Sequence, residues 1–126
     1  MTAVGIAQIA VRVLLALIFI VAGTAHFVGL QRQFVAIVPG WVPLPALLVV
    51  QITGVMELAG GLGLLIPPLL RPVGICLMIF LVAVFPANVV AAQQQVPFSN
   101  PLWARALVQV LLIAAIGWVS LGSSPT

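Results

Sequence analysis

Apolar residues dominate this chain, and the few polar ones divide it into four runs. Each run is long enough for a helix of about 20 residues, the length that crosses a hydrocarbon core roughly 30 Å thick. The stretches between the runs are short and contain prolines or polar residues, which are typical of helix ends. We therefore predict four transmembrane helices, over residues 4–28, 44–66, 69–92 and 102–121.

The first run, over residues 3–30, is interrupted only by Gln8, Arg12 and His26. A secretory signal peptide is the alternative interpretation, because small residues lie near the end of the run. The run has no basic segment before it and is long enough to span a bilayer, so we favour a transmembrane helix. In that helix the Arg12 side chain is expected to reach toward the starting side of the membrane or to mark the interface.

The segment between the first two predicted helices, residues 29–45, is too apolar for a free loop. It contains Trp41, and tryptophan favours the headgroup level of a membrane. Pro43 and Pro45 suit the first turn of the helix that follows. We expect a short interfacial or re-entrant segment here.

Pro86 lies inside the third predicted helix. Proline removes one backbone hydrogen bond from a helix, so we expect a kink at this point. The kink exposes a carbonyl group beside Asn88.

The composition agrees with a membrane location, since 64% of the residues are hydrophobic, 4% are charged and the mean hydropathy is +1.40. A soluble domain of this size needs more polar residues to cover its surface. We therefore predict an all-α fold, a four-helix transmembrane bundle that forms a single domain over residues 1–126.

Four arginines and one glutamate give the chain a net charge of +3, and the arginines are scattered along it. Nucleic-acid binding needs a basic patch on one face, so we expect no nucleic-acid partner. With four spans, two arginines fall on each side of the membrane. The positive-inside rule therefore sets no orientation.

Glu57 is the only acidic residue, and it lies near the middle of the second predicted helix. A carboxylate at that depth costs about 2.5 kcal/mol or more, so it is expected to be partnered or functional and to face the protein interior. Thr53, Gly60 and Gly61 share its helix face. These small residues let a neighbouring helix or a ligand approach closely.

Other polar side chains lie toward one end of the predicted bundle. At about 1.5 Å per residue, His26, Asn88 and Arg105 each lie about one turn from the far side of the membrane. Gln109 follows Arg105 by one turn on the same helix face. We predict one polar pocket open toward that side, with Glu57 as a candidate proton relay. Its ligand-binding residues are His26, Glu57, Asn88, Arg105 and Gln109.

Each of these residues also has a structural interpretation. Glu57 and Arg105 can form an ion pair that joins two helices without chemistry. His26 can be an interfacial histidine that binds a loop carbonyl. Asn88 and Gln109 can hold helices together through hydrogen bonds.

Several kinds of site are excluded by the residue types. One histidine is too few for bis-histidine haem ligation, and one histidine with one glutamate is too few for a metal site. The single cysteine, Cys76, has no partner for disulfide chemistry within the chain. Neither a nucleophile elbow nor a phosphate-binding glycine loop is present. What remains is proton handling or the binding of a lipophilic molecule.

Five segments, taken in order, resemble one family. They cover residues 22–27, 38–45, 53–65, 85–88 and 105–109. The Glu-Leu-Ala-Gly-Gly core of the third and the Phe-Pro-Ala-Asn step of the fourth resemble the DoxX family of small bacterial membrane proteins. Members typically show Arg-Leu-Pro-x-Gln where this chain reads Arg-Ala-Leu-Val-Gln, so the chain keeps the polar pair but lacks the proline.

The resemblance implies a multi-pass protein of the bacterial cytoplasmic membrane with both termini on the cytoplasmic side. It also implies membrane redox metabolism, with oxidoreductase subunits or oxidative-stress enzymes as partners besides the lipid bilayer. We expect at most a non-catalytic or quinone-binding subunit, which binds a quinone or another lipophilic molecule and has no covalent cofactor. The alternative is a scaffold or anchor protein, although the short, nearly uncharged loops disfavour electrostatic recruitment of a soluble partner.

Overall fold

The computed structural model describes residues 2–29, 31–93 and 102–122, without the side chains at positions 88, 91–93, 102, 103 and 105. Within this part of the chain all regular structure is helical and there is no strand, so the prediction of an all-α protein is confirmed for it. The helices are α1 (Ala3–Ala25), α2 (Gln31–Ala36), α3 (Ala46–Leu64), the 3-10 helix η1 (Pro67–Leu69), α4 (Leu70–Gln93) and α5 (Leu102–Leu121).

The helix ends follow from local chemistry. The Thr2 hydroxyl caps α1 by accepting a hydrogen bond from the Gly5 amide at 3.0 Å. Pro45 precedes the first residue of α3, and the next pair of prolines, at positions 67 and 68, lies in η1, which leads directly into α4. Pro86 lies inside α4, which continues to Gln93.

Three helical segments are long and apolar enough to cross a membrane: Ala3–Ala25, Ala46–Leu64 and Pro67–Ala87. The apolar stretch of α5, Ala106–Leu121, is shorter. Large apolar side chains on these helices remain exposed, for example Val21 at 68% and Ile79 at 64%. Such extensive apolar surface suits hydrocarbon rather than water, and the chain is accordingly a membrane protein with transmembrane helices.

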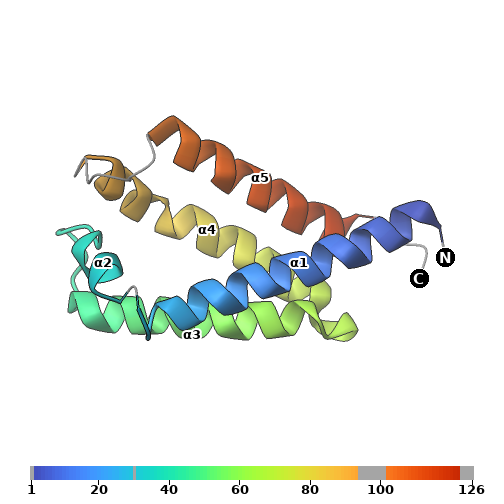
Figure 1. Ribbon diagram of the computed structural model, residues 1–126, viewed down its shortest axis with the longest axis horizontal. Coiled ribbons are helices and arrows are strands. Elements are labelled where there is room, and N and C mark those ends of the chain that lie inside the picture. Colours follow the sequence, from blue (N-terminus) through green and yellow to red (C-terminus); the bar gives the residue numbers. More distant parts are fainter. Residues whose placement is uncertain (1, 30, 94–101, 123–126) are drawn as a thin grey trace.

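The long helices are arranged as two closely packed pairs. α1 packs most extensively against α3, and α4 packs most extensively against α5, while α3 with α4 and α1 with α5 join the pairs. Figure 1 shows the start of α1 and the end of α5 at one end of the molecule, with α2 and the start of α3 at the other. The buried apolar core consists of Leu15, Ala16, Phe19, Leu64, Leu77, Phe80, Leu81, Ile116 and Val119.

Glycines set the close approach of α1 and α3. A Cβ atom placed on Gly54 would lie 2.7 Å from the His26 Cβ atom, and one placed on Gly61 would lie 2.9 Å from the Ala16 carbonyl oxygen. Both distances are shorter than ordinary contacts, so only glycine allows this spacing. The predicted role of the glycines near Glu57 in helix packing is therefore correct, and the crossing holds the end of α1 against the middle of α3.

The segment predicted to be interfacial or re-entrant contains the short helix α2. This helix packs against α3 at the end of the molecule where α1 finishes. Trp41, later in the same segment, is 73% exposed. Its exposed position suits a residue at the membrane surface, while the depth of the segment in the bilayer stays a prediction.

Candidate functional site

A cavity of about 420 Å³ lies between the two helix pairs, at the end of the molecule that carries α2. Its wall is formed by α3, α4, α5, the α2 segment and His26, the residue that follows α1. Most of the lining is apolar, with Phe34, Trp41 and Phe80 as its aromatic members. The polar lining residues are His26, Thr53, Glu57 and Gln109.

His26 directly follows α1 and is held by two contacts. Its Nδ1 atom lies 2.7 Å from the carbonyl oxygen of Ala22, one turn earlier in the helix. Because a carbonyl oxygen only accepts hydrogen bonds, Nδ1 carries the proton and the other ring nitrogen is an acceptor when the ring is neutral. The ring also stacks on Phe34 of α2, with centroids 4.2 Å apart. The histidine is therefore fixed in orientation.

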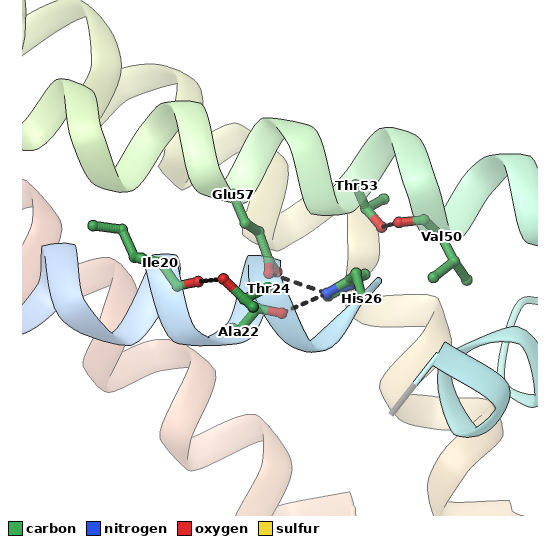
Figure 2. A network of polar contacts seen from close by, with 7 residues as sticks. All are labelled: Ile20, Ala22, Thr24, His26, Val50, Thr53 and Glu57. Atoms are coloured by element: carbon green, nitrogen blue, oxygen red, sulfur yellow. Dashed lines mark hydrogen bonds and ion pairs between the residues drawn. The ribbon is translucent and has the colours of Figure 1, made fainter. Parts of the chain in front are cut away.

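Glu57 projects from α3 toward His26, as Figure 2 shows. Its Oε2 atom lies 3.4 Å from the His26 Nδ1 atom, and the two side chains are 12% and 11% exposed. The Nδ1 proton is already donated to Ala22, so Oε2 is buried without a hydrogen-bond partner among the described residues. A buried polar atom in this state is costly unless a further group satisfies it.

Thr53 and Gln109 complete the polar side of the cavity. The Thr53 hydroxyl donates to the Val50 carbonyl at 2.9 Å, so its proton is used within α3. Gln109 reaches the cavity from α5 and is 9% exposed. Among the polar residues of the cavity lining, we therefore regard Glu57 as the best candidate to bind a ligand, because its Oε2 atom has no hydrogen-bond partner among the described residues.

The structure brings together three of the five predicted site residues, His26, Glu57 and Gln109, at one cavity. Asn88 and Arg105 belong to α4 and α5, but their side chains lie outside the described part of the structure. The predicted ion pair between Glu57 and Arg105 therefore stays a prediction, as does ligand binding by the whole set. The carbonyl that His26 contacts belongs to its own helix, not to a loop.

Other lining residues were not among the predicted site residues. Thr53 had a usable signal, since it precedes Glu57 by four residues and shares its helix face. The sequence carries no comparable signal for Phe34 and Trp41, because they lie in a connecting segment whose apolar residues follow no regular period. Their place at the cavity depends on how the α2 segment folds back over α3.

A second group of buried polar atoms lies toward the other end of the molecule. Gln8 Nε2 donates to the Trp118 carbonyl at 3.1 Å, and the Ser120 hydroxyl donates to the Ile116 carbonyl. The Oε1 atom of Gln8 and the Nε atom of Arg12 are buried without hydrogen-bond partners among the described residues. These side chains are not part of the cavity lining, so they offer positions for control substitutions.

Metal binding has no candidate in the described ranges, where no three or more His, Cys, Asp and Glu residues are grouped so that they could hold an ion. The polar atoms at the cavity instead suit hydrogen bonding to an organic molecule. Such a molecule needs a mainly apolar body to match the lining.

One family model covers most of the chain. It is described as "Domain of unknown function (DUF8561)" and matches residues 15–120, a range that includes His26, Glu57 and Gln109. No curated protein and no solved structure matches the chain. None of these comparisons tests the resemblance to the DoxX family, which stays a prediction.

Proposed function

The chain belongs to the DUF8561 family, whose description names no function, and we propose from the site itself that it binds a quinone or another lipophilic molecule in the cavity between its helix pairs. In this proposal it is a DoxX-like accessory subunit of a membrane redox system. It forms a four-helix transmembrane bundle in the bacterial cytoplasmic membrane, with both termini on the cytoplasmic side. Its partners are oxidoreductase subunits or oxidative-stress enzymes.

The buried Oε2 atom of Glu57 is the observation that carries the proposal. The Glu57 side chain lines a cavity of about 420 Å³ whose wall is mostly apolar, and this oxygen has no hydrogen-bond partner among the described residues. Ligand sites of about 300–1,000 Å³ commonly combine an apolar lining with a few polar groups that orient the ligand. An apolar ring bearing a carbonyl oxygen has both features, and quinones are the membrane-soluble molecules of this kind.

The carboxyl group suits both redox forms of such a ligand. When protonated, Glu57 donates a hydrogen bond to a quinone carbonyl oxygen, and when ionised it accepts one from a quinol hydroxyl. Conversion of quinone to quinol takes up two electrons, supplied by an oxidoreductase partner, and two protons. We assign to Glu57 the transfer of one of these protons to the oxygen that it contacts.

The fixed orientation of His26 supports this assignment. Its Nδ1 proton is committed to Ala22 and its ring is stacked on Phe34. The imidazole therefore limits how Glu57 can move, while the donation of Nδ1 to Ala22 leaves the Glu57 Oε2 atom without a hydrogen-bond donor among the described residues. His26 acts in this scheme as a positioning residue.

Quinone content tests the proposal directly. The protein is purified in mild detergent from bacterial membranes, and the extracted quinone is quantified per chain for wild type, Glu57→Gln and Ser120→Ala. Near-stoichiometric quinone is expected in the wild type and in Ser120→Ala, whose substituted residue lies outside the cavity lining. Glu57→Gln is expected to lose it while keeping its helical circular dichroism spectrum.

Two results oppose the proposal. Quinone that stays bound in Glu57→Gln removes the carboxyl from the site. Absence of quinone from every sample, followed by failure of added quinone to bind, favours the scaffold or anchor alternative. In that case Glu57→Gln changes only the stability of the fold.

A further inference from the structure

A second hollow lies on the exposed side of α3 and α4, where Met56 is 46% exposed, and every residue of its wall is apolar or weakly polar. This α3–α4 groove has a volume of about 330 Å³. Its wall contains no charged residue, and both helices are long and apolar enough to span the membrane. The groove is lined by Met56, Ala59, Gly60, Leu69, Pro72, Val73, Cys76, Leu77 and Phe80.

Phe80 lies between the α3–α4 groove and the polar cavity. It lines both spaces and is itself 5% exposed. The two hollows therefore share one buried aromatic side chain in their walls. Met56 and Glu57 are consecutive residues of α3, and the first lines the groove while the second lines the cavity.

We propose that the α3–α4 groove holds the apolar tail of the molecule whose polar head lies beside Glu57, and that Phe80 marks the junction between head and tail. This inference rests on the proposed function, because it assigns the rest of the same ligand. It specifies an amphipathic lipophile with a carbonyl-bearing head and a long hydrocarbon or isoprenoid chain. Such a ligand enters from the bilayer, not from water.

The separation of polar and apolar walls supports a ligand of this shape. The polar residues His26 and Glu57 line the cavity, whereas the groove offers only apolar or weakly polar side chains, which match hydrocarbon. A lipid acyl chain matches the groove equally well in polarity. Displacement of the head group distinguishes the two occupants, because only a tail joined to the head group leaves with it.

Photolabelling separates these occupants. The protein is placed in phosphatidylcholine nanodiscs with a benzoquinone whose alkyl chain carries a diazirine near its end, irradiated and mapped by mass spectrometry. Label is expected on groove residues such as Met56 and Cys76. An excess of the same benzoquinone without a chain is expected to abolish this label, because it displaces the head group from the polar cavity.

A matched pair of double variants locates the tail. Ala59→Phe with Cys76→Phe fills the groove from both walls, while Val55→Phe with Ile79→Phe places the same two phenyl side chains at exposed positions outside both linings. The first pair is expected to lose the groove label and to keep binding the chainless benzoquinone. The second pair is expected to keep both.

Each remaining outcome counts against a defined part of the scheme. If the chainless benzoquinone binds but leaves the groove label unchanged, the groove holds bilayer lipid and the inference is wrong while the proposed function stands. Label spread evenly over exposed positions such as Val55 and Ile79 overturns the inference in the same way. If the chainless benzoquinone does not bind the wild type, the proposed function and the inference both fail.

Discussion

Replacing Gly54 with alanine tests whether the close crossing of α1 and α3 holds His26 beside Glu57. The new Cβ atom would lie 2.7 Å from both the His26 Cβ and the Phe27 Cε2 atoms, and 3.2 Å from the Gly23 carbonyl oxygen. Carbon atoms in ordinary contact are about 3.5–4.0 Å apart, so the end of α1 must move outward by about 1 Å. That movement lengthens the 3.4 Å contact between His26 and Glu57.

The expected magnitude combines two opposing effects. Overpacking of a tight interface costs about 1–3 kcal/mol. Alanine in place of a helical glycine returns about 0.5–1 kcal/mol. We therefore expect Gly54→Ala to lower the free energy of unfolding by up to about 2.5 kcal/mol and to reduce bound quinone.

The free energy of unfolding in detergent and the quinone content are measured for Gly54→Ala. Substitutions at two other glycines serve as controls for both measurements. A Cβ atom on Gly117 would meet only Met78 Sδ, at 3.6 Å, so Gly117→Ala is expected to stabilise slightly. Gly61→Ala meets Ala16 and Ile20 at 2.9 and 2.8 Å on the same interface, at residues that do not line the cavity. It should lose stability but retain quinone. Unchanged stability and quinone in Gly54→Ala would refute the reasoning.

Three further substitutions are expected to separate structural from ligand-binding roles. Phe34→Ala removes the ring stacked on His26, and should cost about 0.5–1.5 kcal/mol of unfolding free energy and weaken quinone retention. Thr53→Val keeps the side-chain shape and should leave quinone content unchanged, with a stability loss of about 1 kcal/mol, because the hydroxyl proton serves a carbonyl of its own helix. Gln8→Leu removes one hydrogen bond to the Trp118 carbonyl, and it also removes a buried oxygen that has no partner among the described residues. These two effects oppose each other, so the free energy of unfolding from chemical denaturation should change by less than about 1 kcal/mol.

Each of these expectations has a contrary result. Full quinone retention in Phe34→Ala would show that the stacking does not order the site. Loss of quinone from a stable Thr53→Val protein would place the hydroxyl against the ligand. A large destabilisation by Gln8→Leu would show that this end of the molecule depends on the amide rather than on apolar packing.

The sequence was sufficient to predict an all-helical chain with long apolar helices, because the signals for such helices are local. Apolar runs of spanning length predict membrane helices wherever they occur, and the prolines near positions 45 and 67 mark the ends of α3. The special status of Glu57 was also readable, since a lone carboxyl in an apolar helix is costly in any arrangement. Its helix face with Thr53 followed from the 3.6-residue period alone.

The tertiary structure decided which groups surround that carboxyl. His26 reaches Glu57 because Gly54 lets the end of α1 lie almost against the α3 backbone. The Ala22 carbonyl accepts the hydrogen bond from His26 Nδ1 that the Glu57 carboxyl would otherwise accept. Phe34 comes to the site on a segment with no periodic signal. These contacts depend on how two helices cross and on how a connecting segment folds back. The pattern of polar and apolar residues along the chain specifies neither arrangement. The sequence by itself therefore determined where a polar site is needed, and only the packing of the helices decided what shape it has.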